Sequence, residues 1–162
     1  MKIYQDDSRS IHDLRRGEWL RSTCPMPRKS KESVVEHISD EHYIESIDSH
    51  VVAAKRGVNV VRIYFFQTRE FFEQKIVKEH LLKLKENNID ILIKIFDEIV
   101  QLDNEIDFLI FGKTKVSVGA IDYASGKVSS AIVHYDPKTI EIYTDIYDKM
   151  ARTAERVGQP TG

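Results

Sequence analysis

Histidine spacing gives the first test for metal or acid–base chemistry in this chain, which has six histidines. His42 and His50 lie eight residues apart in a segment expected to be helical, so about 12 Å separates them along the helix axis. That distance is too long for two ligands of one metal ion. His80 stands in a helical row with Phe72 and Ile76, which is typical of a core histidine with a hydrogen-bonded ring. We therefore expect no metal site and no cofactor.

Nucleophile and phosphate-loop motifs are absent from the sequence. Cys24 lies between Thr23 and Pro25, away from any helix N-terminus that would lower its thiol pKa, so we do not expect it to be a nucleophile. A single cysteine also excludes an intrachain disulfide. No GxSxG, GxxxxGK[ST] or GxGxxG pattern occurs. The absence of these motifs argues against the enzyme classes that they mark. It does not exclude an active site formed by residues that are distant in the sequence.

An acidic segment has a partial resemblance in spacing to a calcium-binding loop. Asp103, Glu105 and Asp107 alternate as the first ligands of such a loop do. Phe108 occupies the place of the turn glycine, however, and Thr114 occupies the place of the final glutamate. We interpret the segment as a solvated connection between two strands.

Composition predicts one soluble domain of ordinary character. The chain has 162 residues, 41% of them hydrophobic and 31% charged, with a net charge of −2. The first 32 residues carry eight bases and five acids, a net charge of +3, which leaves −5 for the rest. The overall charge argues against an electrostatically driven binder of nucleic acid or anionic membranes. No apolar run reaches the roughly 18 residues of a membrane span, and we expect a cytoplasmic location.

The hydrophobic pattern predicts a three-layer α/β domain with a mixed, partly parallel sheet. Residues 1–32 are interpreted as a basic, irregular arm, because two prolines flank Met26 and exclude a helix interior, and Trp19 is expected to pin the arm to the body. Residues 33–157 form the domain, and 158–162 a frayed tail. The expected strands are 33–38, 58–66, 89–96, 107–111, 115–121 and 128–134, and the expected helices are 40–56, 68–87 and one beginning at Asp136.

The strand at 58–66 combines aromatic residues with Arg62, a composition that also occurs in sheets on which RNA bases stack. Its apolar run is nearly continuous, and it lacks the glycine-flanked pattern of such sheets. A strand buried on both faces is therefore the better interpretation.

The end of the first long helix resembles the phospholipase D-like domain, in which an A-x-RGV-x-V motif leads from a helix into a parallel strand. The matching positions are Ala54, Arg56, Gly57, Val58 and Val60. The hairpin at 107–122 and the strand and helix that close the chain are similar to the elements that follow in that family. The resemblance covers about residues 33–157 and implies one lobe of a two-lobed enzyme.

The catalytic motif of that family, His-x-Lys-x4-Asp, is missing. Alignment of the hairpins places Asn104, Ile106 and Phe111 at the positions of the histidine, lysine and aspartate. Ile106 cannot hold a phosphate charge and Asn104 cannot form a phospho-enzyme. The resemblance therefore implies a lobe that has lost phosphodiester chemistry by the family mechanism.

Three functions follow from these observations. The leading prediction is a catalytically inactive phospholipase D-like domain that acts as a binding, sensory or regulatory module, homodimeric as the paired lobes imply, with a protein partner recruited through the arm. The first alternative is an enzyme with reassigned chemistry in the degenerate cleft, whose polar candidates are Asn104, Ser117, Asp122 and His134. The second alternative is a nucleic-acid-binding protein that uses the basic arm.

Overall fold

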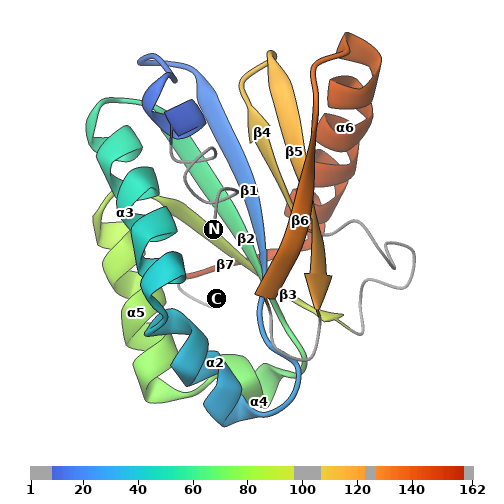
Figure 1. Ribbon diagram of the computed structural model, residues 1–162. Helices are drawn as coiled ribbons and strands as arrows, with labels where there is room; N and C mark the ends of the chain where they lie inside the picture. The colour runs from blue at the N-terminus through green and yellow to red at the C-terminus, as the bar shows by residue number, and fades with distance from the viewer. Residues whose placement is uncertain (1–8, 97–106, 123–126, 159–162) are drawn as a thin grey trace.

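A seven-stranded sheet runs through the molecule with helices on both faces (Figure 1). The computed structural model describes residues 9–96, 107–122 and 127–158, and at 120–122 and 127–130 it describes the backbone alone. The strand order is β6-β5-β4-β1-β2-β3-β7. The strands are β1 (Trp19–Pro25), β2 (Asn59–Phe66), β3 (Asp90–Ile95), β4 (Phe108–Phe111), β5 (Lys115–Asp122), β6 (Lys127–His134) and β7 (Glu155–Arg156).

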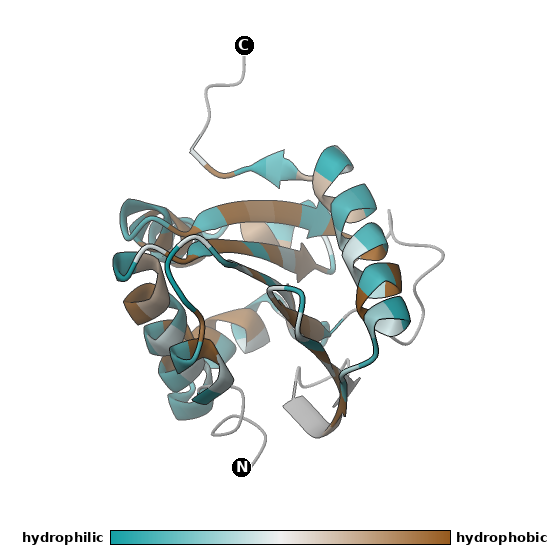
Figure 2. Ribbon diagram, turned by 90° about the horizontal axis from the view of Figure 1, so that it is seen from above, coloured by the Kyte–Doolittle hydropathy of each residue, from teal (hydrophilic) through white to brown (hydrophobic). Residues whose placement is uncertain are grey.

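The helices form two separate layers, one on each face of the sheet, as the view from above shows (Figure 2). The first layer contains α2 (Lys31–Ile38), α3 (Glu41–Lys55), α4 (Arg69–Phe72) and α5 (Lys75–Glu86), and α6 (Pro137–Thr153) forms the second. Strands β1, β2 and β3 are parallel, whereas β4, β5 and β6 are antiparallel. The predicted three-layer α/β domain with a mixed sheet is confirmed.

The prediction of an irregular arm is wrong for residues 19–25, which form a strand at the centre of the sheet. β1 pairs in parallel with β2 and antiparallel with β4. Leu20 is fully buried, and Pro25 is tolerated because it is the last strand residue, after which the Met26 amide donates to Phe65 O at 2.9 Å. Trp19 is 46% exposed and does not anchor the segment. Residues 19–25 are therefore part of the sheet.

The strand predicted at 33–38 is helix α2 instead. Ser30 caps this helix in a capping box with Ser33, in which each side chain bonds to the other residue's backbone. Val34 and Ile38 are buried one helical turn apart. The helix predicted at 68–87 is divided into α4 and α5, whereas the helix capped by Asp40 is confirmed as α3.

The turn at Gly57 joins α3 to β2 beside the start of β1. Gly57 has φ +92°, and its carbonyl accepts from the Gly17 amide at 2.9 Å. A Cβ at position 57 would lie 2.8 Å from the Arg16 Cγ, so the Arg16 side chain lies directly over this glycine. Three segments that are far apart in the sequence meet at this end of the sheet, because the Gly112 amide of the β4–β5 turn also donates to Trp19 O at 2.8 Å.

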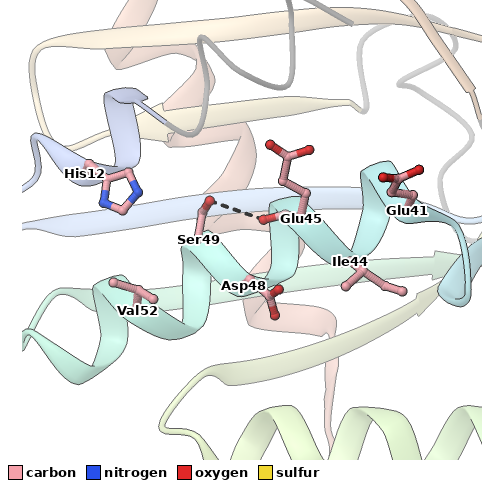
Figure 3. A pocket seen from close by; sticks show the side chains of 7 residues that line it. All are labelled: His12, Glu41, Ile44, Glu45, Asp48, Ser49 and Val52. Atoms are coloured by element: carbon pink, nitrogen blue, oxygen red, sulfur yellow. Dashed lines mark hydrogen bonds between the residues drawn. The ribbon is translucent and has the colours of Figure 1, made fainter.

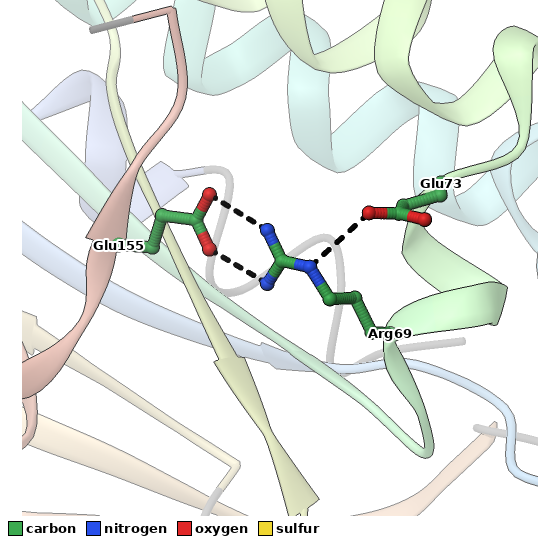
Figure 4. A network of polar contacts seen from close by, with 3 residues as sticks. All are labelled: Arg69, Glu73 and Glu155. Atoms are coloured by element: carbon green, nitrogen blue, oxygen red, sulfur yellow. Dashed lines mark hydrogen bonds and ion pairs between the residues drawn. The ribbon is translucent and has the colours of Figure 1, made fainter. Parts of the chain in front are cut away.

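The end of the described chain is held by an ion-pair cluster (Figure 4). Arg69 donates to both carboxylate oxygens of Glu155 at 2.9 and 3.0 Å, and its Nε donates to Glu73 at 3.1 Å. The hydrogen bonds that Arg69 donates to Glu155 lower the pKa of Glu155. The short strand β7, which the sequence did not predict, is thereby held beside β3.

Residues 159–162 of the predicted tail, and Asp103 and Glu105 of the acidic segment, lie outside the described residues.

Substitution of Gly57 tests the turn geometry. Gly57→Ala should lower the free energy of unfolding by about 1–2 kcal/mol, because an L-residue is strained at positive φ and the new methyl must displace Arg16. Gly17→Ala is a matched control, since Gly17 has φ +88° and a Cβ added there would meet no atom within 4 Å. Urea unfolding should give a larger loss for Gly57→Ala. Equal losses would show that the Arg16 contact is unimportant.

Candidate functional site

The residues proposed for a degenerate cleft do not form one site among the described residues. Asn104 lies outside the described part of the chain, and Asp122 lies at the end of β5, where its side chain is not described. Ser117 and His134 belong to the paired strands β5 and β6, but they are offset by one residue in the register.

That offset places Ser117 and His134 on opposite faces of the sheet. His134 pairs with Val116, which packs in the core under α6, and its ring stacks 6.5 Å from the ring of Tyr143 on α6. Ser117 is buried at 4% exposure and faces the other side. A shared cleft containing these two side chains is therefore excluded.

A buried polar cluster lies between α3 and the sheet, and Arg62 on β2 is its centre. Arg62 is 5% exposed. Its Nε donates to Tyr64 Oη at 3.0 Å, and its Nη1 donates to Ser22 Oγ at 3.3 Å and to His50 Nε2 at 3.0 Å. His50 Nδ1 lies 2.7 Å from Ser46 O, which can only accept, so Nδ1 carries the proton and Nε2 is the acceptor for Arg62.

The cluster continues from Tyr64 to α5. Tyr43 Oη lies 2.7 Å from Tyr64 Oη and 2.6 Å from His80 Nε2. Burial lowers the pKa of His80 to about 4, and burial together with the Arg62 charge lowers the pKa of His50 to about 3. Both histidines are therefore neutral near pH 7. The predicted hydrogen bond of the His80 ring is present, but the side chain is only half-buried, and Ile76 of the predicted buried row is 50% exposed.

This cluster fixes helices to the sheet and is closed to a ligand. Its hydrogen bonds connect β1, β2, α3 and α5, and its central guanidinium is shielded from solvent. Cys24 lies nearby, and burial raises the pKa of its thiol, whose Sγ contacts Met26 Sδ at 3.7 Å. The predicted absence of a nucleophilic role for Cys24 agrees with this environment. The buried strand predicted at 58–66 is also confirmed.

The outer face of α3 forms an open groove of about 510 Å³ (Figure 3). Three acidic residues of α3 line it, and none of the described residues that line it is lysine or arginine. Ile44 and Val52 are 45% and 42% exposed beside the carboxylates. The described residues that line it are His12, Glu41, Ile44, Glu45, Asp48, Ser49 and Val52. A surface of this charge repels phosphate groups.

The end of α3, the turn before β1 and the β4–β5 turn lie at the same end of the sheet (Figure 1), and each of them contains basic residues. We call this surface the basic end. Arg56 anchors it by donating to the carbonyl oxygens of Ile11, His12 and Leu14 at 3.1, 3.3 and 3.1 Å. Its members are Arg15, Arg16, Lys55, Arg56, Lys113 and Lys115.

Four bases of the basic end are exposed and form no ion pair with a described residue. They are Arg15, Arg16, Lys55 and Lys113. Elsewhere Arg21, Arg69 and Arg156 pair with Asp148, Glu155 and Asp90. The acids of the same segments are Asp13 and Glu18, and Glu18 accepts the Arg15 amide at 2.6 Å. The basic end is therefore an exposed positive surface.

Sequence reasoning found the charge of the N-terminal segment but not this surface. Lys55 and Lys113 lie 40 and 98 residues beyond Arg15 in the chain, and backbone hydrogen bonds at Gly57 and Gly112 bring their segments to the same end of the sheet. The spacing of the bases along the sequence contains no signal for this arrangement.

Comparisons with solved structures show a likeness in fold. No protein-family model and no curated protein matches the chain. The fold is similar to the solved structure of TrmBL2, described as an archaeal chromatin protein with a novel mode of DNA binding, at a TM-score of 0.53 and 12% identity. The similarity covers 94% of this chain, which spans 50% of that chain.

This likeness corrects the leading functional prediction. The sequence favoured an inactive phospholipase D-like binding, sensory or regulatory module, whereas the similar solved structure is a DNA-binding chromatin protein. The second alternative, a nucleic-acid-binding protein, agrees better with that finding. The likeness itself shows the shared fold.

The buried cluster predicts a pH dependence of stability. Because the pKa of His50 is lower in the folded state than in the unfolded state, folding favours the neutral ring. Its contribution is complete above about pH 6.5 and is lost as pH falls toward 3. His50→Gln should therefore reduce the slope of unfolding free energy against pH by about 1.4 kcal/mol per unit between pH 6 and 4.

Urea unfolding at several pH values measures this slope. Glutamine retains a donor for Ser46 O and an acceptor for Arg62, so the variant should stay folded. His12→Gln, which changes an exposed histidine, is the control and should leave the slope as it is. An unchanged slope in His50→Gln would mean that the ring is already protonated in the folded protein.

Proposed function

We propose that this domain belongs to a DNA-associated protein and that its basic end contacts the phosphate backbone of duplex DNA. The observation that carries the proposal is that Arg15, Arg16, Lys55 and Lys113 are all exposed at one end of the sheet and form no ion pair with a described residue, although Asp13 and Glu18 belong to the same end. The fold shared with a chromatin protein that binds DNA supports it.

The chemistry of the basic end suits phosphate rather than base edges. Guanidinium and ammonium groups donate to phosphate oxygens, and such contacts carry no direct sequence information. The bases stand on two turns and a helix end, so no regular element presents them to the major groove. Binding should therefore be independent of sequence and sensitive to salt.

The net charge of −2, which argued against a nucleic-acid binder, conceals a separation of charge along α3. The carboxylates of Glu41, Glu45 and Asp48 line the groove, whereas Lys55 is the last residue of the helix. The field near a protein surface depends on where its charges lie as well as on their sum. DNA is therefore expected to meet the molecule at the basic end and to avoid the groove.

Four further predictions remain proposals. They are the resemblance to the phospholipase D-like domain, the homodimer, a protein partner for residues 1–32 and a cytoplasmic location. Within the described ranges, no helix is both long enough and apolar enough to cross a membrane. An enzyme with reassigned chemistry gains no support from Ser117 and His134, since they face opposite sides of the sheet.

Salt-dependent DNA binding tests the proposed function. Fluorescence anisotropy with a labelled duplex of about 20 base pairs should give micromolar or weaker affinity that falls steeply with salt. If the four bases each neutralise one phosphate, the slope of log K against log salt should be about −3.6. The combined variant Arg15→Gln, Arg16→Gln, Lys55→Gln and Lys113→Gln should abolish most of this slope.

A matched variant separates this surface from net charge. Lys78, Lys83, Lys149 and Arg152 are exposed on α5 and α6, and changing these four to Gln removes the same charge. This control should retain most of the affinity and the slope. An equal loss in both variants, or binding that is flat across salt in the native protein, would contradict the proposal.

A further inference from the structure

Strand β6 is an open edge of the sheet. It pairs with β5 on one side, and no described element pairs with its other side. A free edge presents a row of unpaired backbone N–H and C=O groups to any extended chain that approaches. The opposite edge of the sheet differs, because β7 is only two residues long.

Exposed hydrophobic side chains are frequent in β6 and in the segment that follows it. Nine large hydrophobic residues are exposed in the described chain, and four of them belong to β6, the residue after it, and α6. They are Ile132 at 65%, Val133 at 41%, Tyr135 at 68% and Ile142 at 49% exposure. Large apolar groups gathered beside an open backbone edge are typical of an interaction surface.

The features that usually prevent an edge strand from pairing with another chain are weak in β6. Residues 128–133 contain neither a charge nor a proline. A bulge does interrupt the strand, since Ala120 pairs with Ser130 and Ile121 with Val128. Beyond the bulge, residues 130–134 keep a regular register with β5, so a regular five-residue edge remains available.

We propose that β6 pairs antiparallel with β6 of a second copy of this chain, about a two-fold axis at Ile132. This register places Ile132 opposite its own copy, Ala131 opposite Val133, and Ser130 opposite His134. The two sheets then continue into one another. The pairing is isologous, because each copy presents the same strand to the other.

The second copy is favoured as the occupant because the edge is complementary to itself. A β-branched residue faces a β-branched residue at the axis, which is a favourable cross-strand pair. Between residues 130 and 133 no charged side chain faces another. A highly charged foreign strand would place its charges against the exposed Ile132 and Val133 without a partner.

The pairing also determines where the two α6 helices lie. Ile132 pairs with Val118, which packs against the core under α6, so Ile132 lies on the α6 face of the sheet. A two-fold axis normal to the sheet places both α6 helices on that same face.

Sedimentation velocity over a range of concentrations, without DNA, tests the interface independently of the proposed function. The native protein should change from monomer to dimer as its concentration rises. Ile132→Lys places two ammonium groups at the axis and should make the protein monomeric. Ile76→Lys, at a residue 50% exposed on α5, is the matched control and should still dimerise.

Hydrogen exchange on the native protein gives a second measurement that needs no variant. In the dimer all amides of residues 130–134 should be protected, whereas in the monomer only those bonded to β5 should be. A native protein that remains monomeric at millimolar concentration would overturn the proposal. So would a dimer that survives Ile132→Lys, or one that leaves alternate β6 amides unprotected.

Discussion

The arrangement of this domain depends on a guanidinium that is buried without a carboxylate partner among the described residues. Arg62 remains charged at any physiological pH, so its donors must find acceptors inside the protein. Tyr64, Ser22 and His50 provide them, and they belong to β2, β1 and α3. Because these bonds have defined geometry, they fix the position of α3 on the sheet. The groove and the basic end take their positions from that helix, since one lies along it and the other at its end.

Sequence patterns predicted the elements whose signals are local. Asp40 and Gly57 mark the ends of α3, and the apolar run of β2 predicts a strand buried on both faces. β1 was missed because its prolines suggested a loop, whereas its strand character depends on pairing with β2 and β4, which are distant in sequence. Residues 33–38 were mistaken for a strand because β-branched residues outweighed the capping box at Ser30.

The candidate sites likewise depend on contacts between segments that the sequence pattern does not reveal. Ser117 and His134 are close in the β5–β6 hairpin, but a register offset of one residue places them on opposite faces. The basic end joins residues from three segments, and a net charge of −2 gave no sign of it. A fold does not by itself determine function. The resemblance to the phospholipase D-like domain suggested a regulatory module, whereas the similar solved structure is a DNA-binding chromatin protein.

Chemical-shift mapping by nuclear magnetic resonance tests the central claim most directly, because it reports where DNA lies on the native protein. Amide shifts would be followed at low salt as an unlabelled duplex is added. The account predicts changes at residues 15–17, 55–57 and 112–115 that saturate together and reverse when salt is raised. Changes centred on the α3 groove or on α6, or no change at all at low salt, would contradict it.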